Sequence, residues 1–596
     1  MSIATKRAYL KVLAGGGGGP FMRHIKMFRA ALAALVTVVL TSQLQAADIF
    51  VSPTGSGEKT GLNWSNALNG SNDGWHIDVK NAITSAVDGG AEEVNVYLAA
   101  GDYTITNQLA LSSITIPVKF CGGYVGTTDG DLTKSETATT LKRNTSYNTR
   151  HINASSIVEL SIERMVFQNG YLTNTSAQRG GSLHLTSCNT MIKECEFSSN
   201  HAKSKSNTTT YGGAVYVNGG SLEVVGSKFS ANKTSGSNCR EYGGAICTSN
   251  ADLIVEDSVF TGNYCTSSQS PVFGGAIAAN EGNIIIKSCE FSKNYVYCSQ
   301  NIGSSFSIGG AISIRSANRF EMSDCKFEDN AGYYGKYPAL KSGVYIDDTY
   351  ITDGVMTSVV ERCVFASRSL PTTYSTSKSN IILNGGCLFM TNCLIACASG
   401  TDSTMTNSIS VLRTGSSSLK DLVHTSNYMP VETAIMELVN CTIADGKGAG
   451  AVRIGTDCDM ILKNCIVSGN TVAGVVNATS IEHSYIQTND DGTWNYEGEG
   501  NLNPNQVGDI NWTGAPYYHL LTKNANGAIT NGWFSGTFES PKTAADSPCI
   551  DAGAPSSLGL DLEPYYSGRR VNIGAYGGTP WASKTSPLPG FKLIIR

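Results

Sequence analysis

Short runs in which apolar and polar residues alternate recur along the chain between residues 165 and 330. In residues 211–230 the runs read Gly-Gly-Ala-Val-Tyr-Val, Ser-Leu-Glu-Val-Val and Ser-Lys-Phe-Ser, and Gly, Asn or Ser separate them. Alternation with a period of two is typical of a strand with one buried face, whereas an amphipathic helix has a period of 3.6. The pattern predicts three short strands in each unit of about 31 residues.

Two motifs repeat in register within this segment. Gly-Gly-small-apolar motifs begin at Gly180, Gly212, Gly243, Gly274 and Gly309. Phe-x-x-Asn motifs begin at Phe197, Phe229, Phe260, Phe291 and Phe327, after a shorter variant at Phe167. Such a period indicates one supersecondary unit stacked on itself. Leucine-rich repeats have a shorter period, and propeller blades have a longer one with four strands.

The repeat therefore predicts an all-β fold, a single-stranded right-handed parallel β-helix with an N-terminal helical cap and a C-terminal cap region. Adjacent coils of such a helix lie about 4.8 Å apart, so equivalent residues stack in columns. The Phe column is expected to fill the core and to continue as Phe365, Ile395, Ile443, Val467 and Ile486. The Asn column is expected at a turn, where each side-chain amide bonds to neighbouring coils.

Changes of pattern divide the chain into five parts. Residues 1–46 combine basic residues, an apolar run from Ala30 to Leu40 and a small-residue ending, which is typical of a signal peptide; the true start is then Met22 or Met27. A membrane anchor is the alternative. We expect an N-terminal cap and first strands in residues 47–115, with a helix over 75–87, the β-helix in 116–490, a C-terminal cap in 491–580 and a tail in 581–596.

Composition narrows the class of partner. Only 15% of residues are charged and 64 are Gly, which argues against a mainly helical fold, and 41% are apolar, which argues against disorder. Residues 1–46 hold six basic residues and no acidic one, so the rest carries 37 basic and 48 acidic residues. Because no basic block is present, nucleic acid is not expected as a partner. We expect no transmembrane segment in the mature chain and predict export to the extracellular space, the cell surface or the outer membrane.

Two families resemble parts of this chain. The paired Gly-Gly-Ala-Ile and Phe-x-x-Asn motifs of residues 160–335 resemble the passenger repeats of polymorphic outer-membrane proteins, which are right-handed, pectin-lyase-like β-helix surface proteins. The C-terminal part resembles the end of bacterial surface proteins called choice-of-anchor Q. The residues that carry this second resemblance are Tyr518-His519-Leu520, the run 547–553, Asp561 and the run 569–576. Asn572 and Gly577 stand where that family usually has acids.

Six of the 17 cysteines follow the core column of the repeat. Cys195, Cys289, Cys325, Cys363, Cys441 and Cys465 each lie two residues before the core position, and in a strand such residues face the same side. We expect buried free thiols there, with disulfides and metal ligation as alternatives. Cys239, Cys265 and Cys298 are expected in loops, where oxidation between neighbouring coils is geometrically feasible.

An enzyme remains the alternative, because many β-helices cleave polysaccharides. Hydrolysis needs two carboxylates facing the scissile bond, and a lyase needs clustered carboxylates for Ca²⁺ with a basic residue. The pairs Asp347-Asp348 and Asp490-Asp491 are expected to be solvated turns. Asp490, Asp491, Glu497 and Glu499 are a candidate for Ca²⁺, although their spacing misses the EF-hand pattern. We assign no catalytic, cofactor-binding or metal-binding residue and expect no cofactor beyond this Ca²⁺.

The segments between each Asn and the next Gly-Gly pair are expected to be polar loops that emerge on one side and form a strip. Its rings are Tyr211, Tyr242, Tyr264, Phe273, Tyr295 and Tyr297. Aromatic rings beside hydroxyls and amides suit an extended sugar chain. The alternative is that these rings only pack the loops onto the helix.

The resulting functional hypothesis is an exported cell-surface protein acting as an adhesin or glycan-binding scaffold. Its expected partner is a polysaccharide or a glycoprotein of a host or cell surface. The second hypothesis is a polysaccharide lyase or glycoside hydrolase acting on acidic polysaccharide. A third is a spacer that projects another module.

Overall fold

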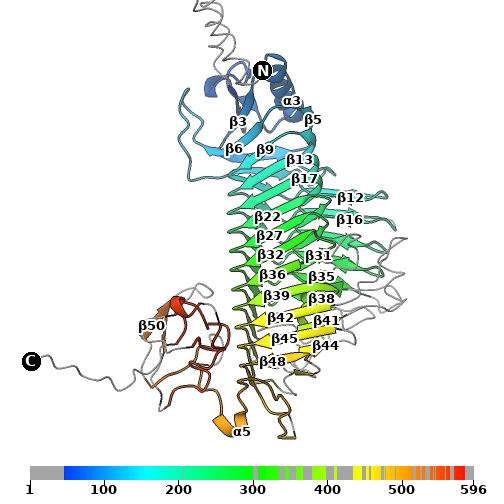
Figure 1. Cartoon of the computed structure of the whole chain (residues 1–596). Coiled ribbons are helices and arrows are strands. Elements are labelled where there is room, and N and C mark those ends of the chain that lie inside the picture. The colour runs from blue at the N-terminus through cyan, green and yellow to red at the C-terminus, as the bar shows by residue number, and fades with distance from the viewer. Residues whose placement is uncertain are drawn as a thin grey trace, which may run out of the picture.

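The computed structural model confirms an all-β parallel β-helix. The short strands form three long parallel ladders, and each ladder is one face of the stack. The N-terminal coils are at the top of Figure 1 and the C-terminal coils at the bottom. The structure describes residues 46–205, 207–299, 307–333, 342–347, 357–366, 379–396, 409–412, 434–445, 452–454, 458–470, 475–476, 478–489, 491–513, 518–523, 527–530, 537–540, 543, 545–557, 559–563 and 570–583. Of the predicted signal peptide (1–46) and tail (581–596), residues 1–45 and 584–596 lie outside these residues.

The first two faces belong to one continuous sheet, because early strands bend from one face to the other. Face A1 consists of β5 (Leu109–Ile114), β8 (Ile152–Ile157), the first halves of β13 (Leu183–Lys193) and β17 (Val215–Val225), β21 (Ile246–Ser249), β26 (Ile277–Asn280), β31 (Ile312–Arg315), β35 (Ser342–Asp347), β38 (Ser379–Asn384), β41 (Ile409–Leu412), β44 (Val452–Ile454) and β47 (Val475–Val476). Face A2 consists of β1 (Ala46–Ser52), β2 (Leu68–Asn69), β3 (Glu93–Ala99), β6 (Val118–Tyr124), β9 (Leu160–Glu163), the second halves of β13 and β17, β22 (Asp252–Glu256), β27 (Asn283–Lys287), β32 (Arg319–Ser323), β36 (Thr357–Glu361), β39 (Gly386–Thr391), β42 (Ala434–Val439), β45 (Cys458–Lys463) and β48 (Ser480–Glu482).

The third face, sheet B, carries the Phe column. It consists of β4 (Gly101–Ile105), β7 (Thr139–Arg143), β10 (Met165–Gln168), β14 (Glu196–Ser198), β18 (Lys228–Ser230), β23 (Val259–Thr261), β28 (Glu290–Ser292), β33 (Lys326–Glu328), β37 (Val364–Ala366), β40 (Leu394–Ala396), β43 (Thr442–Ala444), β46 (Ile466–Ser468) and β49 (Tyr485–Ile486).

The predicted core column is present and continuous. Rings stack face to face from Phe167 to Phe365, with neighbouring ring centroids 4.8 or 4.9 Å apart. The column continues through Ile395, Ile443 and Val467, which pair in register. All these side chains are buried in one hydrophobic cluster that runs along the stack. One coil spacing therefore sets both the strand pairing and the ring stacking.

The Asn column forms a hydrogen-bond ladder at the turn after sheet B. The Nδ2 of Asn232 donates to Asn263 Oδ1 at 2.9 Å and to the carbonyl of Phe197 at 2.9 Å. Its Oδ1 accepts from the backbone N and the Nδ2 of Asn200 at 3.1 and 2.9 Å. Asn200, Asn232, Asn263 and Asn294 are fully buried, so each amide satisfies groups that water cannot reach.

The two glycines of each Gly-Gly pair are required for different physical reasons. Gly212 has φ +58°, a left-handed conformation that favours Gly. Gly213 is needed for close approach instead, since a Cβ there would lie 2.0 Å from the carbonyl oxygen of Gly244 in the next coil. The same arrangement recurs at Gly243 and Gly244. The pair therefore makes the corner and also allows the coils to stack tightly.

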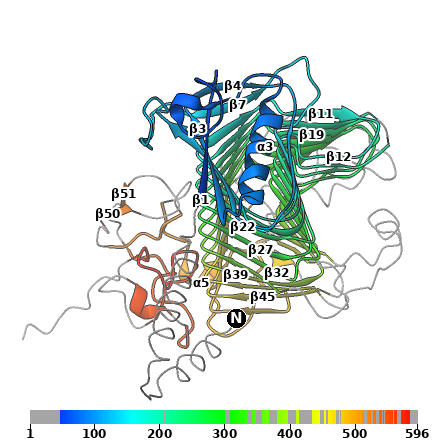
Figure 2. The same cartoon turned by 90° about the horizontal axis from the view of Figure 1, so that it is seen from above.

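The N-terminal cap contains the predicted helix, α3 (Trp75–Asp88). It lies across the first coils at the open end of the stack (Figure 2). Trp75, Val79 and Ile83 are buried against the core, and Ala86 and Val87 pack beside it. A helix in this place shields the apolar end and the unpaired edge of the first strands. In the described part of the chain, no helix is long and apolar enough to cross a membrane.

The C-terminal region does more than cover the far end of the stack. Trp494 donates to the carbonyl of Ile486 at 3.0 Å, and Tyr496 packs against the core, so these residues close the end. The described residues after about 510 lie beside the lower part of sheet B (Figure 1). There Tyr518 and Tyr576 bury the outward side chains of the last coils.

The sequence of sheet B explains this docking. The outward column reads Lys228, Val259, Glu290, Lys326 in the upper coils and Val364, Leu394, Thr442, Ile466 in the lower coils. The four lower residues are all buried. The change from charged to apolar side chains thus coincides with the coils that the C-terminal region covers.

The segments expected to be polar loops are strands instead, in the described coils. They form a projection, here called the fin, of two small parallel sheets. Its sheet C consists of β11 (Tyr171–Asn174), β15 (His201–Ser204), β19 (Lys233–Gly236), β24 (Tyr264–Ser267), β29 (Tyr295–Cys298) and β34 (Ala331–Tyr333). Its sheet D consists of β12 (Gln178–Arg179), β16 (Thr210–Tyr211), β20 (Glu241–Tyr242), β25 (Val272–Phe273) and β30 (Ser307–Ile308). Because every coil repeats the same excursion in register, neighbouring coils satisfy its backbone groups.

The inward cysteines also form a ladder, in which serines fill some places. The column is Cys195, Ser227, Ser258, Cys289, Cys325, Cys363, Cys393, Cys441, Cys465 and Ser484. The backbone N–H of Cys195 donates to Ser227 Oγ at 3.0 Å, and that of Cys289 donates to Cys325 Sγ at 3.5 Å. The column cysteines are thiols rather than disulfides. Burial raises the pKa of Cys195 to about 12.

The expectation that Cys265 and Cys298 lie in loops is wrong. Both lie in strands of sheet C, and their side chains are buried with Val272 and Val296 between the two sheets of the fin. Cys239 lies between strands, as expected, but it is buried too. The error arises because the fin has a core of its own, which needs small apolar side chains.

Candidate functional site

The six rings of the predicted strip lie on two opposite faces of the fin, so they do not form one strip. The structure places Tyr211, Tyr242 and Phe273 in one column of sheet D. It places Tyr264, Tyr295 and Tyr297 on sheet C. The sequence showed that all six occur in the same segment of the repeat, but a segment that folds back on itself presents its two strands on different sides.

The sheet D rings pack the fin onto the helix body. Tyr242 and Phe273 are buried, and their centroids are 4.8 Å apart. They belong to a hydrophobic cluster with outward residues of face A1, such as Tyr216 and Cys247. For Tyr242 and Phe273 the packing alternative of the sequence prediction therefore holds. Tyr211, at the upper end, is only partly buried.

The sheet C rings reach the surface. Along β24 and β29 the side chains alternate between half-buried and buried, which puts Tyr264, Thr266, Tyr295 and Tyr297 on the outer face. The rings of Tyr264 and Tyr295 stack with centroids 4.8 Å apart and planes 4° apart. We call the outer face of sheet C around these residues the tyrosine face.

Cations and hydroxyls continue the tyrosine face along the fin. The Nζ of Lys233 lies 5.6 Å from the centroid of the Tyr264 ring, on the coil above. Ser235 is in the same column as Thr266, and its Oγ lies 2.7 Å from His201 Nε2. Because Tyr264 and Tyr295 stack face to face, these two rings offer their edges and phenol hydroxyls, and Ser235 and Thr266 add aliphatic alcohols.

One carboxyl group lies inside the fin. Glu241 of sheet D is fully buried, near the hydroxyls of Thr210 and Thr234. Burial raises its pKa well above the ordinary value, nearby Cys239 adds to this, and the two hydroxyls offset a part. A protonated acid in this place can donate as well as accept a hydrogen bond.

A second polar group, which the sequence did not predict, lies on the outer side of face A1. Arg315 Nε lies 3.7 Å from Asp347 Oδ2, and Asn384 Nδ2 donates to Asp347 Oδ1 at 3.2 Å and to the Tyr345 hydroxyl at 3.1 Å. All four side chains are buried. The expectation of a solvated turn at Asp347 is therefore wrong, while Asp348 lies outside the described residues. The signal was the register, since Arg315, Asp347 and Asn384 occupy the same position of successive coils.

The polar group on face A1 has a single carboxyl side chain, that of Asp347, which limits the reactions it could catalyse. Hydrolysis of a glycosidic bond needs two carboxyl groups. The described outward positions of face A1 contain one, Asp347, and Arg315 neutralises it. Among the described residues, no group of three or more His, Cys, Asp or Glu side chains could hold a metal ion.

The acidic stretch near the C-terminal end of the stack is only partly described. Asp491 is exposed and accepts from the backbone N and the hydroxyl of Thr493 at 2.9 and 2.6 Å, which is a local turn. Glu497 and Glu499, with Glu482, line a pocket of about 590 Å³. Asp490 lies outside the described residues, so Ca²⁺ binding here stays a prediction.

The C-terminal motif residues have structural contacts. His519 is buried, and its Nε2 lies 2.6 Å from the carbonyl of Trp581. Tyr518 donates a hydrogen bond from its hydroxyl to Asp445 on the stack. Asn572 is buried, accepts from the backbone N of Asp551 at 2.9 Å and donates to the carbonyl of Ser583 at 2.8 Å. These residues build the C-terminal region and dock it.

Comparisons with known proteins find few similarities. No family model and no curated protein matches the chain, so the two sequence resemblances stay predictions. A solved structure of pectate lyase Pel9A aligns at 10% identity and a TM-score of 0.32 over 89% of this chain and 96% of that one. The catalytic unit of a thermostable GH87 alpha-1,3-glucanase from Streptomyces thermodiastaticus strain HF3-3 aligns at 13% identity and a TM-score of 0.27 over 72% and 69% of the two chains. Both likenesses are too distant to carry an argument about this chain.

Proposed function

We propose that this chain is an exported surface protein that binds an extended glycan on the tyrosine face, as an adhesin or glycan-binding scaffold. The observation that carries the proposal is the set of half-exposed rings Tyr264, Tyr295 and Tyr297 on one ordered sheet. The predicted signal peptide supports export. The proposed ligand is a polysaccharide or the glycan of a surface glycoprotein.

The physical basis is a match between sugars and this surface. A sugar chain carries hydroxyls at its edges and C–H groups on its faces, so it needs donors and acceptors beside apolar carbon. Phenol hydroxyls, Ser235 and Thr266 supply the polar groups, and the ring edges supply the apolar contact. Since sheet C is hydrogen-bonded from coil to coil, these groups are held in place before the ligand arrives, which lowers the entropic cost of binding.

The test is a combined change of Tyr264→Ala, Tyr295→Ala and Tyr297→Ala, with binding measured on an array of neutral and acidic glycans. We expect binding to fall at least tenfold while the far-ultraviolet spectrum and Tm stay close to those of the wild type, because the rings lie on the surface. Tyr147→Ala, an exposed ring outside the fin, is the control. Undiminished binding by a folded triple variant would overturn the proposal.

A lyase or hydrolase acting on acidic polysaccharide is the second candidate, and the buried group at Asp347 favours it. Asp347 supplies one carboxylate that can accept a proton, and Arg315 and Asn384 supply a positive charge and hydrogen-bond donors beside it, which suits the proton abstraction of a lyase. The test is incubation with uronic-acid polymers with and without Ca²⁺, with detection of unsaturated products and reducing ends. Cleavage that disappears in Asp347→Asn would support this candidate, and no cleavage across the polymers would eliminate it.

A further inference from the structure

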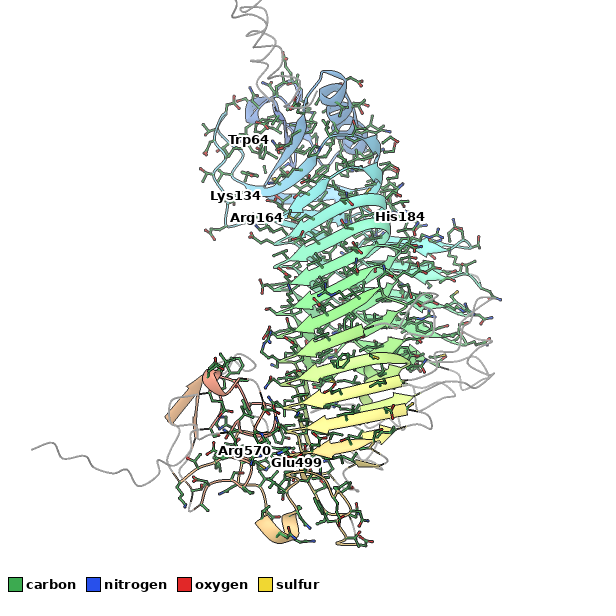
Figure 3. The ribbon with its side chains drawn as sticks, in the orientation of Figure 1. Trp64, Lys134, Arg164, His184, Glu499 and Arg570 are labelled. Atoms are coloured by element: carbon green, nitrogen blue, oxygen red, sulfur yellow. The ribbon has the colours of Figure 1, made fainter. Side chains whose placement is uncertain are left out.

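Three basic side chains meet where the fin joins the first coils of face A1, on the opposite side of the fin from the tyrosine face. Arg150 lies just before β8, Arg179 ends β12, and His184 lies in β13. Figure 3 labels His184 on the side of the stack from which the fin projects. The cluster is separate from the tyrosine face, so its role does not depend on the glycan proposed there.

The three groups act on one another electrostatically. Burial, together with the charges of Arg150 and Arg179, lowers the pKa of His184 to about 4. Burial also lowers the pKa of Arg150, to about 10, with a contribution from Arg179. The geometry agrees with this: the Tyr216 ring contacts both the Arg179 guanidinium and the His184 ring, and Arg150 lies two residues before Ile152, which begins the strand that pairs with the strand of His184.

The cluster lacks a negative partner within the protein. Nε and Nη1 of Arg150 are buried and have no hydrogen-bond partner among the described residues. No described carboxylate pairs with Arg150 or Arg179, although other arginines of the chain do form such pairs, for example Arg362 with Asp324. A buried guanidinium with unused donors is costly, and an oxyanion is the ligand that satisfies it.

Aromatic rings hold the more exposed members in place. The guanidinium carbon of Arg179 lies 5.7 Å from the Tyr211 ring centroid and 5.9 Å from the Tyr216 centroid. The rings of His184 and Tyr216 have centroids 5.6 Å apart. Stacking on a ring orients a guanidinium while its N–H groups stay available to a ligand.

This arrangement occurs at one level of the stack. In the next coils Tyr211 and Tyr242 take the place of Arg179, while Tyr216 and Cys247 take the place of His184. The basic group is therefore a local feature and not a property of the repeat.

We propose that Arg150, Arg179 and His184 form a binding site for an oxyanion, either a carboxylate or a sulfate group such as those carried by acidic glycans. Arg150 offers its buried donors to the anion from below. Arg179, at the surface, closes over it. His184 and the Tyr211 and Tyr216 rings form the wall.

The test measures Tm and heats of binding at fixed ionic strength, with sodium chloride as the balancing salt. The probes are inorganic sulfate, glucuronate as a free monosaccharide, and glucose as the neutral counterpart. We expect saturable binding of sulfate or glucuronate, and no binding of glucose. Sulfate alone would identify a sulfated ligand, and glucuronate alone or more tightly would identify a carboxylated one.

Two variants locate the site. Arg179 is exposed, so we expect Arg179→Gln to keep the wild-type Tm without anion and to weaken anion binding at least tenfold. Arg150→Met should remove the rise of Tm caused by the anion.

The matched control is Arg164→Gln, because Figure 3 labels Arg164 on the opposite edge of the stack. Absence of saturable binding by both anions, or an equal loss in the Arg164 control, would overturn the proposal. Failure of the glycan array alone would not affect it.

Discussion

Asn232 illustrates how one residue type is repeated for a physical reason. Its side chain forms two donated and two accepted hydrogen bonds, and all of them connect its coil with a neighbouring one. A carboxylate could accept but not donate, and a larger amide would not fit a fully buried turn. The ladder is thus a structural device, since the same contacts recur in successive coils.

The corresponding change is Asn232→Ala, which leaves the Asn200 donors and the Phe197 carbonyl without partners. We expect the free energy of unfolding to fall by about 1–3 kcal/mol, the usual cost of unsatisfied buried groups. Denaturant unfolding measures it. Asn218→Ala is the control, because Asn218 is exposed on face A1. An unaltered stability of Asn232→Ala combined with a loss of binding would show that the column is functional.

The buried acid Glu241 gives a prediction about pH. Its pKa in the folded protein is raised, so its contribution to stability is complete below the unfolded value of 4.5 and is lost as the pH rises above that value. The stability of the wild type relative to Glu241→Gln should therefore fall from pH 5 to pH 8, by up to about 1.4 kcal/mol per pH unit. Urea unfolding at a series of pH values measures this difference. Glu290→Gln, on the exposed side of sheet B, is the matched control.

At the scale of elements, the docking of the C-terminal region depends on outward positions of sheet B. Leu394 is buried against Tyr518 and its neighbours, whereas Val259, in the same column four pairs higher, is uncovered by this region. Hydrogen bonds from Asn392 and Asn440 to the carbonyl of Gly577 add polar contacts. The interface therefore combines an apolar centre with amide groups at its edge.

Leu394→Lys should loosen the C-terminal region, because a buried ammonium group without a partner is strongly unfavourable. We expect limited proteolysis to remove the residues after about 510 faster than in the wild type, while the stack itself stays resistant. Val259→Lys introduces the same side chain in the same column and should leave the proteolysis unaltered. Equal cleavage in both variants would contradict the assigned interface.

At the scale of the whole molecule, each coil contacts mainly its neighbours, and stability is a sum of coil and interface terms. The Phe column crosses several coils without interruption, so a cavity in one coil also weakens the contacts of the next. Phe260→Ala should lower the free energy of unfolding by about 3–5 kcal/mol. Denaturant unfolding monitored by circular dichroism measures the loss.

Labelling of the buried thiols measures how far along the stack the Phe260→Ala cavity weakens the packing. Cys289 and Cys325 should resist thiol reagents in the native protein and react after denaturation. In Phe260→Ala we expect Cys289, one coil away, to be labelled faster, and Cys465, several coils away, to keep its wild-type rate. Rapid labelling of Cys289 in the native wild type would contradict its place in the core.

Alternating side chains and a constant period are local properties that every coil repeats, and they determined the β-helix and the Phe and Asn columns. The helical spacing of apolar residues over 75–87 determined the N-terminal helix in the same local way. The tertiary structure alone decided which side of a strand meets a neighbour. It folded the supposed loops into a fin, which separated Tyr242 from Tyr264, and it brought Arg315 to Asp347 and Arg150 to His184. Contacts between distant side chains depend on how segments of unequal length fold back, and on which surfaces the C-terminal region covers. A period read along the chain contains neither, because it records the spacing of residues and the alternation of the two sides of a strand, and not which distant segment each side meets.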